Sequence, residues 1–167
     1  AARQKEMLAG LEKALIGLVS ARETEGRRLA TVLADQLATI ERLVEAAAAA
    51  PSRTPEAIRQ RLAEQLARIL DGASTLDPQR LHQEAALLAV RGDYEEEIKR
   101  LKAHVAGARE ILAAAGPHGR KLDFLSQEFN REANTLCSKA GDIEVTRIGL
   151  DLKTVIDQMR EQVQNLE

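Results

Sequence analysis

Residues 141–167, GDIEVTRIGLDLKTVIDQMREQVQNLE, carry the clearest structural signal in the sequence. Apolar side chains recur there at steps of three, four and seven residues, which places them along one side of an α-helix. The members of this stripe are Val145, Ile148, Leu152, Val155, Met159 and Leu166. The preceding pair Gly141-Asp142 indicates where the helix begins. The stretch therefore predicts one long helix with coiled-coil-like packing.

Similar spacing continues upstream, where proline and glycine divide the chain into further helical segments. We expect these segments at about 4–50, 55–70, 78–115 and 120–139. Thr54-Pro55 and Asp77-Pro78 each combine an N-cap residue with a proline suited to the first helical turn. The predicted apolar face of the first segment consists of Leu8, Leu11, Leu15, Leu18, Leu29, Val32, Ile40 and Leu43.

The composition indicates the same fold class. Aromatic residues make up only 2% of the 167 residues, whereas strands depend on aromatic and β-branched side chains. The chain is rich in Ala, Leu, Glu, Arg and Gln, which favour helices. We therefore predict an elongated all-α fold, in which the first two segments form a helical hairpin and the last three form an antiparallel bundle. The expected units are residues 1–76 for the hairpin region and 77–167 for a C-terminal helical domain.

Charge and motifs narrow the classes of function. The formal net charge of −2 excludes binding of nucleic acid through a large overall positive charge, but a local basic face remains open. The single cysteine, Cys137, cannot form an internal disulfide, so we expect a reducing, cytoplasmic location. No apolar run approaches the ~20 residues of a membrane span. The sequence also contains no Gly-rich phosphate loop and no Ser-His-Asp arrangement, so we expect neither a membrane partner nor a small-molecule cofactor.

Charged residues interrupt two of the apolar stripes. Arg22 and Glu25 fall in the stripe of the first segment, and Glu84 and Arg91 fall in that of the third. Because burial of an unpaired charge is costly, two interpretations are open. The bundle widens locally so that these groups pair or reach water, or the four side chains face one another in a polar site between helices. We predict that the four lie near one another.

The segment at 120–139 has an unusual polar face. Its polar residues recur at steps of four, three and four, and include two asparagines, which are poor helix formers. The members of this polar stripe are Asp123, Gln127, Asn130 and Asn134. Such a face suits a phosphate backbone, a divalent metal or a subunit interface, and we predict the functional surface there. The alternative is that these side chains cap neighbouring helices or pair across a subunit contact.

Several stretches resemble one family of bacterial proteins. They are GRKLDF at 119–124, QEFNREANTL at 127–136, Ser138-Lys139 and QMREQVQNLE at 158–167, together with RETEG at 22–26 and the stretch 93–104. On these residues the chain resembles the C-terminal part of the YicC/YloC proteins, most specifically from about residue 84 to residue 167. The N-terminal domain of that family carries a Ser-Met-Thr-Gly-Phe-Gly motif, which does not occur in this sequence. We therefore expect the sequence to be part of a longer protein.

The resemblance implies a function. Proteins of this family are described as stress-induced, oligomeric endoribonucleases that use a divalent metal. It implies a cytoplasmic enzyme that cleaves RNA phosphodiester bonds with Mn²⁺ or Mg²⁺, and a homo-oligomer for which a hexameric ring is one expected form. The apolar stripe of residues 145–166 independently suggests a homo-oligomer, because it is more apolar than a helix at the edge of a small monomer needs.

Metal-assisted cleavage of RNA needs carboxylates to hold the metal and cations to bind the phosphate. Candidate carboxylates, among which the sequence does not choose, are Glu25, Glu84, Asp93, Glu96, Glu97, Asp123, Glu128 and Glu132. As metal ligands we name Glu25, Glu84, Glu97 and Glu128, and as catalytic residues Glu128, Glu132, Asp123 and His104, the last as a general acid or base near neutral pH. The candidate phosphate-binding residues are Arg22, Arg91, Arg100, Arg120, Arg131 and Lys139.

Two other classes of function are consistent with the sequence. In one, the chain is a non-catalytic helical module for oligomerisation or RNA clamping, and the catalytic groups lie in another domain. In the other, the chain is a passive RNA-binding scaffold. The polar residues of segment 120–139 distinguish these classes, because an enzyme should direct them into a cleft and a module should direct them into a subunit contact.

Overall fold

The computed structural model describes residues 2–70, 83, 86, 93–114 and 116–164. Every regular element in these ranges is helical, so the predicted all-α class is confirmed. The elements are α1 (Ala2–Ala48), the short 3-10 helix η1 (Pro51–Arg53), α2 (Pro55–Leu70), α4 (Glu95–Ala113), α5 (Gly119–Lys139) and α6 (Ile143–Gln164). Among these helices, none combines the length and the apolar content that a membrane crossing requires.

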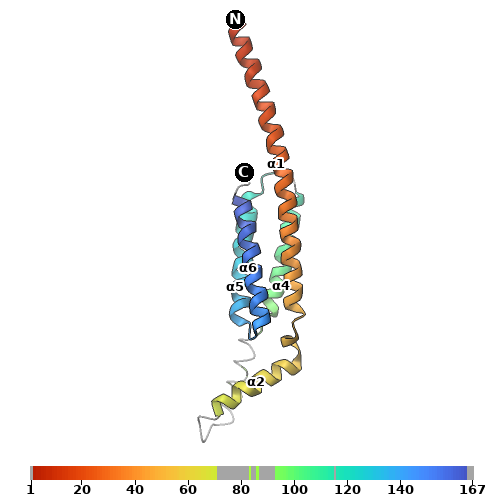
Figure 1. Ribbon diagram of the computed structural model, residues 1–167, viewed down its shortest axis with the longest axis vertical. Coiled ribbons are helices and arrows are strands. Elements are labelled where there is room, and N and C mark those ends of the chain that lie inside the picture. The colour runs from red at the N-terminus through yellow and green to blue at the C-terminus, as the bar shows by residue number, and fades with distance from the viewer. Residues whose placement is uncertain (1, 71–82, 84–85, 87–92, 115, 165–167) are drawn as a thin grey trace.

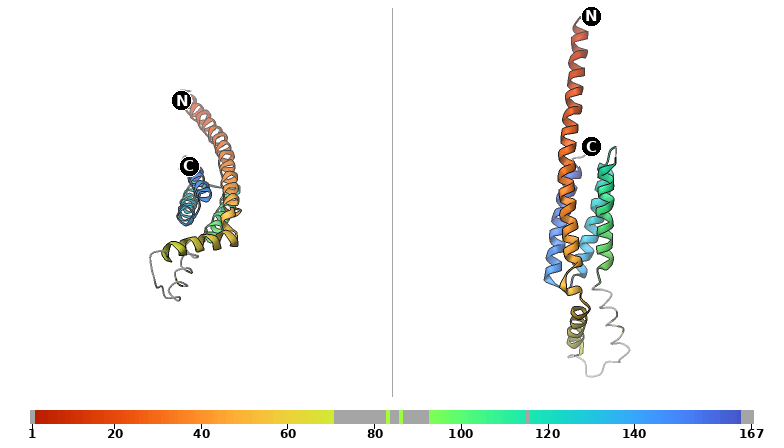
Figure 2. Two further views of the ribbon diagram at one scale, coloured as in Figure 1. Left: turned by 60° about the horizontal axis from the view of Figure 1, so that its bottom comes forward. Right: turned by 90° about the vertical axis from the view of Figure 1, so that its right-hand side faces the viewer.

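Four of the helices form an antiparallel bundle (Figure 1). Helix α1 packs against α4 and α6, and α5 lies between α4 and α6 on the other side. The N-terminal half of α1 extends well beyond the other three helices, and α2 leaves the opposite end of the bundle (Figures 1 and 2). The molecule is therefore elongated along the bundle axis.

The core of the bundle follows a heptad pattern. Each helix buries residues at alternating steps of three and four, the spacing that lets side chains of antiparallel helices interlock. The core side chains are Leu33, Leu37, Ile40, Val44 and Ala47 of α1, Ile98, Leu101, Val105 and Ala108 of α4, Leu122, Phe129, Ala133 and Leu136 of α5, and Val145, Leu152, Ile156, Met159 and Val163 of α6. The core thus lies between helices of one chain.

Local sequence explains where several helices begin. The Asp142 carboxylate accepts a hydrogen bond of 2.8 Å from the backbone N–H of Val145, and so caps the start of α6. The Thr54 hydroxyl accepts a bond of 3.2 Å from the N–H of Ala57 at the start of α2, as predicted. Between α4 and α5, Gly116 has a φ of 109°, a value that only glycine adopts without strain. The cap predicted at Asp77-Pro78 lies outside the described residues.

The pairing of helices differs from the prediction in the first half of the chain. Helix α1 does not fold back on α2 as a hairpin but supplies the fourth helix of the bundle, because its apolar positions from Leu33 onward match those of α4 and α6. The predicted apolar face near its N-terminus, represented by Leu8 and Leu15, is exposed. The predicted domain boundary, at residues 76 and 77, lies outside the described residues.

The stripe of α6 also has a different role from the one predicted. The last member of the stripe, Leu166, lies outside the described residues. The side chains of Val145, Leu152 and Met159 are buried inside the bundle and at most 1% exposed. They contact the neighbouring helices of the same chain, so this stripe gives no reason to expect an oligomer. Residues Gly149, Ile156 and Val163 complete the buried face, whereas Ile148 and Val155 lie at its edge.

Candidate active site

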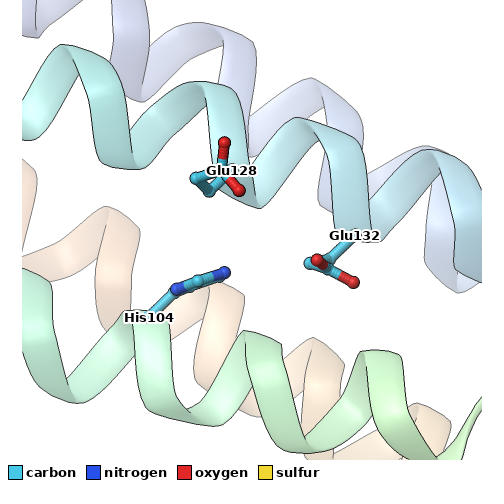
Figure 3. Close-up of side chains that lie close together, drawn as sticks. All are labelled: His104, Glu128 and Glu132. Atoms are coloured by element: carbon cyan, nitrogen blue, oxygen red, sulfur yellow. The ribbon is translucent and has the colours of Figure 1, made fainter.

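Three predicted catalytic residues meet between α4 and α5. His104 projects from α4 toward Glu128 and Glu132 of α5 (Figure 3). One ring nitrogen of His104 and one carboxylate oxygen from each glutamate all lie within 4.8 Å of one another. The two glutamates share a face of α5 because they are four residues apart, close to one helical turn. Antiparallel packing of α4 and α5 brings the histidine opposite them.

Burial makes this cluster unusual. The Glu132 residue is only 4% exposed, and Glu128 and His104 are half-buried. The Nε2 atom of His104 is shielded from solvent and has no hydrogen-bond partner in the described part of the chain. The histidine ring contacts Phe129 edge to face, with the ring centroids 5.6 Å apart. A buried ring nitrogen without a partner is costly, so this atom is suited to a ligand that the protein chain does not supply.

Two arginines neutralise the carboxylates of the cluster. Arg100 Nη1 donates a hydrogen bond of 3.2 Å to Glu132 Oε1, and Arg131 Nη1 lies 3.0 Å from Glu128 Oε1. Arg100 also pairs with Glu96, one turn earlier on α4. Hydrogen bonds and charge attraction from Glu132, followed by those from Glu96, raise the pKa of Arg100, which therefore stays charged. Two of the five predicted phosphate-binding arginines thus lie beside the predicted catalytic carboxylates.

The donor set fits a divalent cation. One imidazole nitrogen and two carboxylate oxygens form a mixed nitrogen and oxygen site, which suits Mn²⁺ better than Mg²⁺, an ion that prefers oxygen alone. A ligand role also fits the buried Nε2 of His104 better than proton transfer with solvent does. The residues present are therefore compatible with a metal ion at this position.

A second ion pair crosses α4 and α5 farther along the bundle. Lys139 Nζ contacts both oxygens of Glu97, at 2.9 and 3.1 Å, and Glu97 is only 4% exposed. The sequence analysis names Glu97 as a metal ligand and Lys139 as a phosphate contact. In the structure they satisfy each other, and this contact joins the end of α5 to the start of α4.

The polar stripe of α5 is largely occupied by contacts within the chain. Asp123 accepts hydrogen bonds of 2.9 Å from Gln127 and 3.3 Å from Arg160, and Asn130 donates one of 2.7 Å to Asp157. Arg160 and Asp157 belong to α6, so the stripe helps to attach α5 to that helix. The fourth member of the stripe, Asn134, is exposed.

The stripe and the cluster consequently lie on different sides of α5, and Asp123 is separate from the other predicted catalytic residues. Sequence analysis did not identify Asp157 and Arg160 as partners of the stripe. Their three-residue spacing on α6 was the available signal, because it places both side chains on one face of that helix.

Three further predicted residues that the structure describes do not join the cluster. Arg22 and Glu25 lie on exposed positions of α1, ahead of its first buried residue, Leu33. Arg120 is exposed in the first turn of α5. Glu84 and Arg91 lie outside the described residues, so the proximity of Arg22, Glu25, Glu84 and Arg91 stays a prediction.

Comparison of the sequence with known protein families identifies the family to which this chain belongs. A family model described as "Endoribonuclease YicC-like, C-terminal" matches residues 47–167, a range that includes the whole cluster. The chain belongs to this family. The predicted resemblance to YicC/YloC proteins is therefore confirmed.

Two curated YicC relatives match nearly the whole chain. A Haemophilus influenzae protein named "Probable endoribonuclease YicC" is 40% identical over 163 residues, which are 98% of this chain and 56% of that protein. A Clostridioides difficile protein of the same name is 36% identical over 157 residues, which are 94% of this chain and 54% of that protein. The chain thus spans about half the length of the curated YicC relatives it matches.

Proposed function

We propose that this chain forms part of an endoribonuclease, and that His104, Glu128 and Glu132 bind a divalent metal ion that RNA cleavage requires. The observation that carries the proposal is the cluster itself, with three potential ligand atoms within 4.8 Å of one another and a buried histidine nitrogen without a partner in the described structure. The names of the two relatives support the same class of reaction.

Each residue would contribute in a specific way. His104 would supply a nitrogen ligand, and Glu128 and Glu132 would supply oxygen ligands. A divalent ion bound there neutralises phosphate charge and activates water. Arg100 and Arg131, whose side chains are 53% and 70% exposed, are close enough to the carboxylates to contact a phosphodiester at the site.

A cleavage assay tests this proposal. Both this chain and the full-length protein are incubated with a structured RNA in the presence of Mn²⁺, Mg²⁺ or EDTA. We expect cleavage by the full-length protein with Mn²⁺, loss of cleavage with EDTA and recovery when Mn²⁺ is added in excess. Cleavage that persists in EDTA would contradict the metal requirement, and RNA that stays intact under every condition would contradict the proposed activity.

One observation favours an additional role as an oligomerisation module. The N-terminal half of α1 extends beyond the bundle (Figure 1). Exposed apolar side chains recur along it at heptad-like spacing. Leu8, Leu11, Leu15 and Leu18 are each more than half exposed, and an exposed apolar stripe of this kind is a typical contact between subunits. We propose that this stripe contacts a second copy of the chain in the predicted homo-oligomer.

A further inference from the structure

The two arginines at the cluster are more exposed than the carboxylates they pair with. The Glu132 side chain is buried, at 5% exposed, and that of Glu128 is half-buried, at 20% exposed. The arginine side chains are 53% exposed for Arg100 and 70% exposed for Arg131. Each guanidinium therefore already reaches solvent, whereas the Glu132 carboxylate is held inside the protein.

Counting charges at the cluster shows what metal binding would change. Without a metal, the carboxylates of Glu96, Glu128 and Glu132 and the two guanidiniums leave one negative charge, and the neutral form of His104 adds no charge. A divalent cation on Glu128 and Glu132 would change this to one excess positive charge. The Arg100 and Arg131 pairs with Glu132 and Glu128 would then be weakened, because each carboxylate would share its charge with the metal.

One negative charge from an anion would neutralise this excess. A phosphodiester carries one negative charge, and guanidinium groups bind phosphate oxygens through two parallel hydrogen bonds. Arg100 and Arg131 are on the two helices that flank the cluster, α4 and α5, so a phosphate lying over the seam would have one guanidinium on either side.

We propose that Arg100 and Arg131 are exchangeable counter-ions that pair with Glu132 and Glu128 in the metal-free protein and pass to an RNA phosphate when the metal binds. This inference rests on the proposed metal site. It implies that a divalent cation and the RNA backbone bind cooperatively. Each should strengthen the binding of the other by the same factor, because coupling between two ligands is reciprocal.

The experiment measures this coupling directly. Binding of Mn²⁺ to the chain is measured by titration calorimetry with and without a short 2′-O-methyl oligoribonucleotide, whose blocked 2′-hydroxyls cannot attack the phosphate. The reciprocal titration measures binding of the oligonucleotide with and without Mn²⁺. We expect each ligand to tighten the other by about 5- to 150-fold, the usual range for coupled sites.

The Arg100→Gln/Arg131→Gln double variant should lose the coupling. We expect it to bind Mn²⁺ alone at least as tightly as the wild type, because the competing cations are gone, but with a coupling factor close to one. The matched control is Arg109→Gln. Arg109 lies on the same helix and pairs with Glu41 of α1 at 2.7 Å, away from the cluster, so this variant should keep the full coupling.

The outcomes separate the two proposals. Equal coupling in the double variant and the wild type would overturn the exchange of counter-ions while leaving the metal site intact. The exchange would also be overturned if the oligonucleotide did not change the affinity for Mn²⁺. Absence of Mn²⁺ binding in the wild type, or unchanged binding in Glu128→Gln, would refute the metal site and the exchange together. If the double variant does not fold, the exposed single change Arg131→Gln must still reduce the coupling, or the proposal is wrong.

Discussion

The ring of His104 stands edge to face against the ring of Phe129, with an angle of 71° between the ring planes. Phe129 is fully buried in the bundle, so this contact limits rotation of the histidine ring. The ring nitrogen at Nε2 is thereby kept inside the protein beside Glu128 and Glu132 (Figure 3). A residue of the hydrophobic core therefore orients the cluster that we propose as the metal site.

Glu128→Gln should remove activity without unfolding the protein. The change keeps the shape of the side chain but deletes a charged metal ligand. Loss of metal-assisted charge stabilisation is worth several kcal/mol, which corresponds to a decrease in cleavage rate of about a hundredfold or more. The rate of RNA cleavage by the full-length protein and its melting temperature are measured together. A fully active Glu128→Gln protein, or one that fails to fold, would remove Glu128 from the catalytic residues.

Asp157→Asn provides the control for that measurement. Asp157 accepts its hydrogen bond from Asn130 of the polar stripe, on the side of α5 that faces α6. We expect this variant to cleave RNA at the rate of the wild type. A loss of cleavage as large as that in Glu128→Gln would place function on the polar stripe after all.

Lys139→Met should destabilise the bundle. The change leaves the carboxylate of Glu97, which is 4% exposed, without its partner. Breaking a buried ion pair in this way costs about 3 kcal/mol, measurable as a lower free energy of unfolding in urea. Lys102→Met is the matched control, because Lys102 pairs with the well-exposed Glu45 at 2.8 Å and should cost at most about 1 kcal/mol. Equal losses of stability in the two variants would show that the Glu97–Lys139 pair contributes no more than the exposed pair does.

Gly149→Ala should strain the contact between α5 and α6. A Cβ atom at Gly149 would lie 2.3 Å from Cys137 Sγ and 3.3 Å from Leu136 Cδ2. We expect a cost of about 1–3 kcal/mol in the free energy of unfolding, the usual range for overpacking. Adding Cys137→Ala removes the clashing sulfur, so the double variant should be more stable than Gly149→Ala alone. A double-mutant cycle that shows simple additivity would contradict this steric explanation.

Tyr94 should ionise at a higher pH in the folded protein than in the unfolded protein. Burial is the largest cause that raises the pKa of this phenol, while Ser52 and Arg53 partly oppose the shift. Because the folded pKa is raised, the stabilisation is complete below the ordinary value of 10.0 and is lost as pH rises through the folded pKa. The chain contains one tyrosine and no tryptophan, so phenolate absorbance reports this residue alone. The same titration midpoint in native buffer and in denaturant would contradict the prediction.

Leu11→Gln/Leu15→Gln should weaken self-association without destabilising the bundle. Both side chains are exposed on α1, at 57% and 52%, and lie before its first buried residue. We expect light scattering to report a smaller particle for the variant than for the wild type, with the melting temperature at low concentration unchanged. A wild-type chain that is monomeric at high concentration would contradict the proposed role of this stripe.

Much of the local structure was predictable because it depends on neighbours in sequence. The periodic spacing of apolar residues predicted α5 and α6 nearly to their observed ends, and the cap at Thr54 was confirmed. The buried part of the first helix was harder to predict. Leu8 and Leu43 have the same apolar character and fit the same spacing, yet one is exposed and the other packs beside the core. Which part of a long amphipathic helix is covered depends on the length of its partners.

In the candidate site, too, some features follow from the sequence pattern and others from the packing of helices. The amino-acid pattern was enough to predict a helical chain of the YicC-like family, and it identified His104, Glu128 and Glu132 as candidates. It did not separate them from Glu97 and Asp123, because all carboxylates have the same chemistry in sequence. The packing of α4 against α5 placed the three within 4.8 Å and paired Glu97 with Lys139, and the packing of α5 against α6 paired Asp123 with Arg160. The physical reason is that spacing along a helix sets which face a side chain occupies, whereas contacts between helices set what it meets there.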